Sequence, residues 1–117
     1  MIPEKILTND HEQLARFAKA LGHPVRVYIM ELLSNQTCCF SGDLAEDLPI
    51  ARSTLSQHLK ELKAAGLIQG TIEAPKIRYC INRENWQKAT RLFGQLFQST
   101  PVINEDCMTN PKLQSAD

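Results

Sequence analysis

The stretch at residues 41–66, SGDLAEDLPIARSTLSQHLKELKAAG, most constrains what this chain can fold into. Its first part predicts a short helix over Ser41–Leu48, because Ser41 is a good N-cap and Pro49 stops the helix. Its second part predicts a helix from about Arg52 to Ala65. The leucines of that helix recur every three or four residues and share one face: Leu55, Leu59 and Leu62.

The residues after this stretch predict a β-hairpin. Gly66 suits the left-handed position after a helix, and Leu67 can then contact Leu62. Residues 67–71 are predicted to form a short strand, and residues 73–76 are turn-like. Residues 77–81 alternate between apolar and polar side chains, as in a half-buried strand. The pair of strands therefore follows the second helix directly.

The flanking segments predict three further helices. The first covers about residues 11–21, capped by Asn9 or Asp10, and the second starts at His23-Pro24 and ends near Ser34. The last runs from Arg83 to about Ser99 with Asn82 as its cap. We therefore expect a mainly α fold with a small β-hairpin, in the order α-α-α-α-β-β-α, over residues 1–100, and a flexible tail over residues 101–117.

The outward face of the helix at residues 52–65 is suited to DNA. It carries short hydroxyls, an amide and basic groups that can bond to base edges and phosphates. We predict that these side chains bind DNA: Arg52, Ser53, Thr54, Ser56, Gln57, His58 and Lys60. Lys76 and Arg78 in the hairpin would then contact the backbone as a wing.

Charge is distributed in keeping with that interpretation. The whole chain has a formal net charge of zero, which is unusual for a nucleic-acid-binding protein. Residues 50–80, however, carry +3, whereas the residues from Ser99 onward carry −2. The positive charge is therefore concentrated where the predicted DNA-binding helix and hairpin lie.

Three segments resemble the winged-helix repressors of the ArsR/SmtB family, the arsenic and zinc sensors. They are ALGHPVRVYIMELL, DLAEDLPIARSTLSQHLKELKAAGLI and IRYCIN, within residues 12–98. The resemblance implies a winged helix-turn-helix fold and a homodimer formed through the first and last helices. It also implies a repressor that leaves its operator when a ligand binds.

The last predicted helix has a large apolar stripe that favours a partner helix. Its members include Trp86, Phe93, Leu96 and Phe97. A monomer of this size would rarely leave such a stripe exposed. A twofold dimer would also present two DNA-binding helices to a palindrome.

The four cysteines suggest how such a repressor would be controlled. The adjacent thiols Cys38 and Cys39, with Cys107 as a third, can hold a trigonal thiophilic ion such as As(III) or Sb(III). Arsenic sensors of the family carry a C-x-C motif slightly further along, where this chain has Phe40 and Gly42. Cys80 alternates with apolar neighbours and is interpreted as incidental.

Other functions of the cysteines stay open at this stage. They can form a redox switch, with Cys38 or Cys39 pairing with Cys107, or serve as partly buried residues with no ligand. The zinc site of the family's other branch uses acidic and histidine residues on the last helix. Residues 83–99 contain no His or Asp, so that site is not expected.

Composition and motifs argue against the remaining classes of protein. No catalytic triad, glycine-rich phosphate loop or paired carboxylates occur, so we expect no enzyme and no required cofactor. No apolar run is long enough for a membrane, and residues 1–13 do not resemble a secretory signal. We therefore expect a cytoplasmic protein that binds operator DNA. A protein-interaction module is the alternative of a different class.

Overall fold

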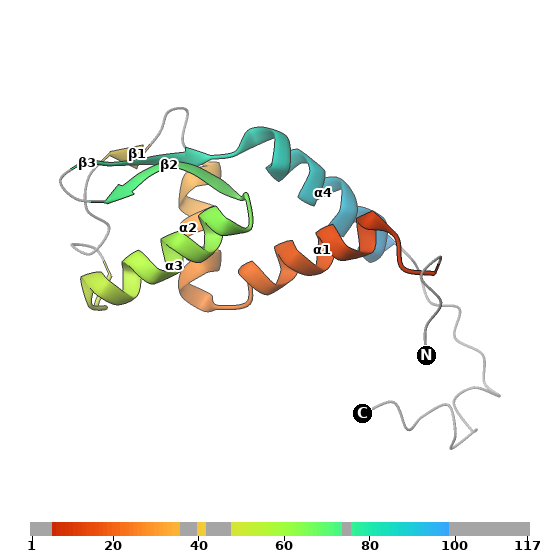
Figure 1. Ribbon diagram of the computed structural model, residues 1–117, viewed down its shortest axis with the longest axis horizontal. Helices are drawn as coiled ribbons and strands as arrows, with labels where there is room; N and C mark the ends of the chain where they lie inside the picture. Colours follow the sequence, from red (N-terminus) through yellow and green to blue (C-terminus); the bar gives the residue numbers. More distant parts are fainter. Residues whose placement is uncertain (1–5, 36–39, 42–47, 74–75, 99–117) are drawn as a thin grey trace, which may run out of the picture.

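The computed structural model describes residues 6–35, 40–41, 48–73 and 76–98. The described elements form a helical framework with one small sheet (Figure 1). In chain order they are α1 (Asn9–Ala20), α2 (Pro24–Ser34), β1 (Phe40–Ser41), α3 (Arg52–Ala64), β2 (Ile68–Glu73), β3 (Lys76–Ile81) and α4 (Arg83–Gln98). This is the predicted winged-helix architecture.

Helix α1 begins two residues earlier than the sequence predicted. Thr8, not Asn9 or Asp10, is the N-cap, and its Oγ1 accepts a hydrogen bond from the backbone N–H of His11. The Nδ1 of His11 accepts in return from the backbone N–H of Thr8 at 3.0 Å. This reciprocal capping box satisfies two backbone donors at once, which the single-cap expectation did not consider.

The boundaries of α2 and α3 agree with the sequence. His23 caps α2 with Pro24 in its first turn. At the end of α3, Gly66 has a φ of +86° and Leu67 N–H donates to the carbonyl of Leu62 at 3.0 Å. Gly66 N–H donates to Lys63, which completes the predicted left-handed cap.

The sheet contains a strand that the sequence did not predict. β1 pairs antiparallel with β3, so the strand order is β1-β3-β2. Ser41, expected to cap a helix, lies in this strand opposite Arg78. The helix expected over residues 41–48 falls mostly on residues 42–47, which lie outside the described residues.

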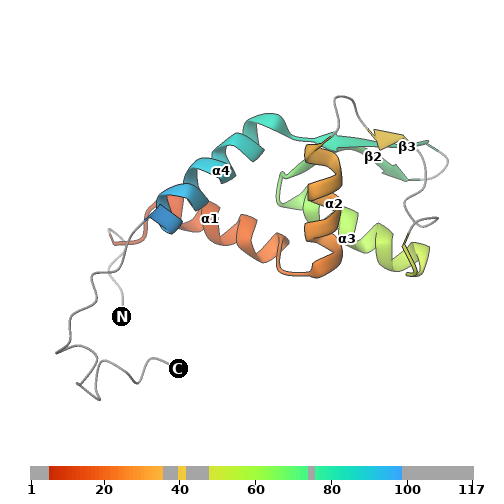
Figure 2. The same ribbon diagram turned by 180° about the vertical axis from the view of Figure 1, so that it is seen from behind.

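The hydrophobic core lies between the sheet and helices α2 and α3. Leu62, Leu67, Ile29 and Tyr79 are almost fully buried there. The view from behind shows α2 crossing α3 beneath the sheet (Figure 2). Each buried leucine contributes about 1.5–3 kcal/mol relative to an exposed one, so the leucine stripe of α3 fixes which face of that helix points outward.

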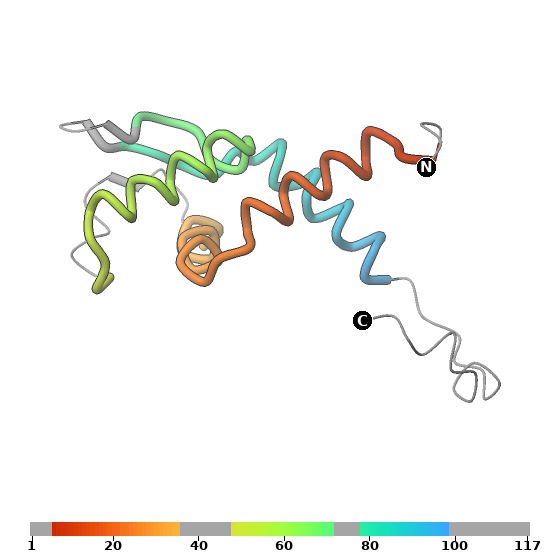
Figure 3. Tube along the Cα trace, turned by 60° about the horizontal axis from the view of Figure 1, so that its bottom comes forward, coloured from red at the N-terminus to blue at the C-terminus, as the bar shows by residue number. Residues whose placement is uncertain are grey.

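Helices α1 and α4 pack against each other and extend away from the sheet (Figure 3). The N–H of Asn85 is bonded to Oδ1 of Asn82, the predicted cap of α4. Leu96 and Phe97, near the end of α4, are 54% and 74% exposed. None of the described helices is long and apolar enough to cross a membrane.

Gly66 gives a direct test of the α3 cap. An added Cβ would lie 2.7 Å from Nδ2 of Asn85, and the left-handed backbone disfavours L side chains. We expect Gly66→Ala to lower the free energy of unfolding by about 1–2 kcal/mol in urea titrations. Gly66→Asn is the matched control, because asparagine tolerates this backbone, and it should cost less. An alanine variant as stable as the original protein would contradict this account.

Candidate nucleic-acid interface

Helix α3 presents a polar, solvent-exposed face over its first two turns. Arg52, Ser53, Thr54, Gln57 and Lys60 are exposed, and Ser56 is half-buried. Leu55, Leu59 and Leu62 are buried on the opposite side. Ala51 is the N-cap of α3 and makes no side-chain cap hydrogen bond, so Ser53 lies within the first turn of the helix and not at its cap.

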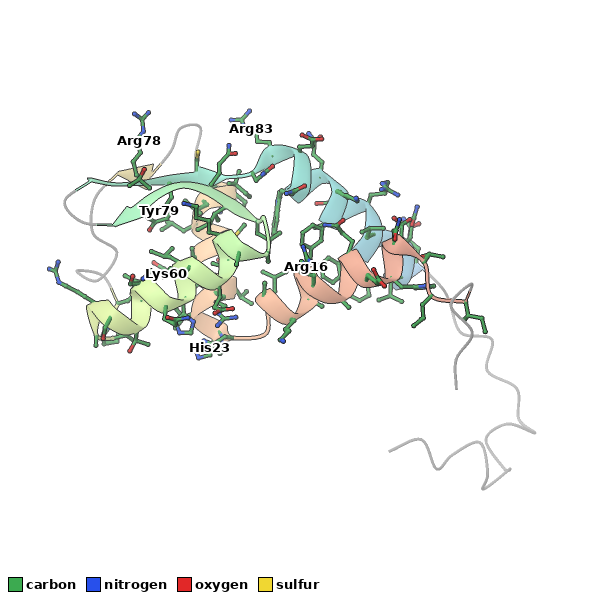
Figure 4. All side chains as sticks on the ribbon, viewed as in Figure 1. Arg16, His23, Lys60, Arg78, Tyr79 and Arg83 are labelled. Carbon is green, nitrogen blue, oxygen red and sulfur yellow. The ribbon has the colours of Figure 1, made fainter. Side chains whose placement is uncertain are left out.

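A side-chain hydrogen bond runs along the exposed face of α3. Gln57 Nε2 donates to Glu61 Oε1 at 3.0 Å, one helical turn further on. This bond holds the amide along the helix surface, with its oxygen free to accept. Figure 4 shows Lys60 on the same helix, away from the sheet. Such a surface can contact both base edges and phosphates.

The hairpin does not bring both of its predicted residues beside α3. Arg78 is exposed and points away from α3, on the opposite face of the sheet (Figure 4). Lys76 begins β3, paired with Glu73, but its side chain lies outside the described part of the structure. Contacts from Arg78 would therefore belong to a separate surface from those of α3.

Lys63 joins α3 to the hairpin, a contact that the sequence analysis missed. Its Nζ donates to the carbonyl oxygen of Gly70 at 2.6 Å. Gly70 has a φ of +125°, and a Cβ there would collide with the backbone of Arg78. The glycine thus allows β2 to approach β3 closely while its carbonyl faces the helix.

His58 is a correction to the predicted interface. It is 8% exposed and lies among the buried leucines of α3, so it does not belong to the outward face. Its Nδ1 accepts a hydrogen bond from Nε of Arg26 at 3.0 Å, and its ring lies 4.3 Å from that of His23. Burial lowers the pKa of His58 below 6.5, and the charges of His23 and Arg26 lower it further.

A sequence signal for this contact existed. Arg26 is spaced three, four and seven residues before Ile29, Met30 and Leu33, which are buried. It therefore lies on the apolar stripe of α2. His58 is likewise three residues after Leu55 and four before Leu62. Two polar residues on facing apolar stripes indicate a buried polar pair.

The predicted metal ligands Cys38, Cys39 and Cys107 lie outside the described residues. Cys39 directly precedes Phe40, the first residue of β1. Cys80 lies half-buried on β3. Among the described residues, no group of three His, Cys, Asp or Glu side chains lies close enough together to hold a metal ion.

A buried leucine stripe, an exposed polar helix face and a following antiparallel hairpin define a winged helix-turn-helix DNA-binding protein. Comparisons with known proteins then identify the family. The family model described as "Bacterial regulatory protein, arsR family" matches residues 23–69. HTH-type transcriptional regulator CmtR of Mycobacterium tuberculosis is 33% identical over 93 residues, which cover 80% of this chain and 75% of the relative.

Two further relatives agree. HTH-type transcriptional regulator YgaV of Escherichia coli is 36% identical over 73 residues, which cover 62% of this chain and 74% of YgaV. The structure of an ArsR-like transcriptional regulator from Rhodococcus sp. RHA1 matches with a TM-score of 0.61 and 26% identity, over 77% of this chain and 84% of that one. The chain belongs to the ArsR family of transcriptional regulators and is not an enzyme.

Proposed function

We propose that this chain is a homodimeric operator-binding repressor that a thiophilic metalloid, As(III) or Sb(III), releases from DNA. The observation that carries the DNA-binding part is the orientation of α3. Its leucines are buried, so Arg52, Ser53, Thr54 and Gln57 necessarily face solvent at its N-terminal end. In helix-turn-helix proteins this end of the second helix enters the major groove.

Different residues of the interface have different tasks in this proposal. Ser53, Thr54 and Gln57 are short or flexible hydrogen-bonding groups suited to base edges. Arg52 and Lys60 supply charge for phosphates, with Ser56 at the margin and Lys76 in the wing. Arg78 points away from α3 on the opposite face of the sheet, so any contact of Arg78 with the phosphate backbone would be made from a separate surface. His58 is no longer part of this set.

Two substitutions in α3 separate base recognition from phosphate contact. On an operator selected from random DNA, we expect Gln57→Ala to lose about 1–3 kcal/mol of discrimination against altered sites. Lys60→Ala should weaken binding to all sequences and reduce the salt slope by about one per subunit. Fluorescence anisotropy at several salt concentrations measures both the discrimination against altered sites and the salt slope.

Arg91→Ala is the matched control for charge loss. Arg91 is exposed on α4, and helical periodicity places it opposite Trp86 and Phe93. It should bind DNA like the original protein. Equal effects of Lys60→Ala and Arg91→Ala would argue that α3 has no special role.

The proposed dimer uses the apolar surface where α1 and α4 meet. A hollow of about 530 Å³ lies there, lined mostly by apolar side chains that include Leu21, Trp86, Phe93 and Phe97. The rings of Phe93 and Phe97 are stacked with their centroids 5.8 Å apart, which places two aromatic side chains together near the end of α4. With Leu96 also exposed, a second copy of these helices is the occupant that fits a twofold axis.

Phe97→Glu should convert the dimer to a monomer in sedimentation velocity experiments. A buried, unpaired carboxylate at the interface would cost several kcal/mol. Val27→Glu is the control, because Val27 is 48% exposed on α2, away from this surface, and should remain dimeric. A dimeric Phe97→Glu protein would place the interface elsewhere.

The proposed inducer site joins Cys38 and Cys39 to Cys107. The first two immediately precede β1, which is hydrogen-bonded to strand β3 of the wing. Binding there would displace the wing relative to α3. The C-terminal end of α4 points away from β1 (Figure 1), which favours the partner subunit's Cys107 as the third ligand.

Titration of the reduced protein on its operator tests the inducer. Arsenite or antimonite should lower operator affinity by about 5- to 150-fold, the usual range of coupling between sites. Cys38→Ser and Cys107→Ser should abolish this response, whereas Cys80→Ser should retain it. Release by peroxide alone would instead support the redox alternative.

A titration with Cd(II) distinguishes a metalloid inducer from a divalent metal ion. Cadmium also prefers thiolates. Release by Cd(II) but not by arsenite would overturn the metalloid assignment. Release by none of the four reagents (arsenite, antimonite, peroxide and Cd(II)) would leave the cysteines without a regulatory role.

A further inference from the structure

The contact between Arg26 and His58 connects three helices at one point. Arg26 lies in the first turn of α2, and its Nη1 donates to the carbonyl of Ala20, the last residue of α1, at 3.3 Å. Its Nε donates to His58 on α3 at 3.0 Å. One guanidinium therefore bonds the C-terminal end of α1 and the inner face of α3 together.

A second histidine, His23, contacts the ring of His58. His23 caps α2 by accepting from the N–H of Val25 at 3.1 Å, which fixes its ring. That ring packs against His58 with a tilt of 44° between the two planes. Figure 4 shows His23 at the end of α2 that lies beside α3. His58 is thus held by a hydrogen bond and by a ring contact.

The position of His58 along α3 gives this contact a consequence for DNA. Gln57 precedes it directly, and Lys60 follows two residues later, both on the exposed face. Rotation or tilting of α3 about its core would move these side chains together. Apolar packing alone is non-directional, whereas a hydrogen bond of a planar guanidinium is directional.

We propose that Arg26 and His58 form a positioning pair that sets the orientation of α3 relative to α1, and that protonation of His58 releases it. This inference rests on the proposed operator binding. Because α1 belongs to the proposed dimer surface, the pair would set how the two recognition helices of a dimer lie relative to each other. Neither residue needs to contact DNA.

Protonation removes the acceptor on which the pair depends. Nδ1 of His58 accepts from Arg26 only while it is unprotonated. A proton there would also place a positive charge beside Arg26 and His23. Arg26 also borders a hollow between α1, α2 and α3 that is lined by Arg16, Lys19 and Glu61, so basic groups outnumber the one acid along that hollow.

The sign of the pH dependence follows from the lowered pKa. The unfolded chain protonates His58 near 6.5, the folded chain only at lower pH. The stabilisation by neutral His58 is therefore complete above 6.5 and is lost as the pH falls through the folded pKa. Operator affinity should fall over the same window. Added positive charge near DNA would have the opposite effect, so the sign itself is diagnostic.

His58→Asn is the decisive variant. Asparagine can present Oδ1 close to the position of Nδ1, but it does not titrate. Between about pH 7.5 and pH 5, we expect the original dimer to lose at least about fivefold in operator affinity, the lower end of usual coupling. His58→Asn should bind normally at the higher pH and lose less than about twofold. His11→Gln, which keeps the capping box at Thr8, should behave like the original protein.

The Arg26→Met variant tests whether Arg26 positions α3 or contacts DNA directly. Methionine keeps much of the side-chain length but donates no hydrogen bond. We expect weaker operator binding with an unchanged salt slope and no remaining pH dependence in the same window. A salt slope reduced by about one per subunit would instead show a phosphate contact and overturn the proposal.

A measurement of stability without DNA tests the Arg26–His58 pair independently of operator binding. Urea unfolding of the original protein and His58→Asn should show the pH-dependent stability of the former only. If that difference appears but no variant or condition binds DNA, the proposed function fails. If DNA binds and the affinity of the original protein is as independent of pH as that of His58→Asn, the positioning pair fails.

Discussion

Burial of the leucine stripe of α3 is the constraint on which the rest of the structure depends. Leu59 and Leu62 lie in the core with Ile29 of α2 and Tyr79 of β3, so one helix face contacts both the helical and the sheet layers. That contact decides which residues of α3 face outward. The proposed DNA-binding surface is therefore a consequence of core packing, and its polar residues can vary in chemistry without changing the fold.

Polar contacts restrict the orientation of α3, which the non-directional packing of the apolar core leaves adjustable. Lys63 bonds to the carbonyl of Gly70 and links α3 to the hairpin, and Arg26 bonds to His58 and links α3 to α2 and α1. Asn85 donates to the carbonyl of Gly66 at 2.9 Å and links α4 to the end of α3. Each contact joins α3 to a different neighbour. Together they define its orientation in a way that leucine burial cannot.

The molecule also separates its proposed tasks in space. The proposed DNA contacts lie on α3, whereas the exposed side chains of Leu96 and Phe97 lie at the C-terminal end of α4. Cys38 and Cys39 precede β1 between these regions in the chain. Regulation of such a protein requires a mechanical connection between the parts, and the described contacts offer two: the pairing of β1 with β3, and the bonds of Arg26.

The sequence by itself determined the four helices that the structure describes, the hairpin and the exposed polar face of α3, because leucine periodicity, capping residues and Gly66 act over a few residues. It did not reveal β1, since two residues carry no periodicity and the strand exists only through its partner. It placed His58 outward, because the bond to Arg26 joins residues 32 apart in the chain. Only tertiary packing decides whether a polar residue beside a leucine stripe is solvated or paired within the core.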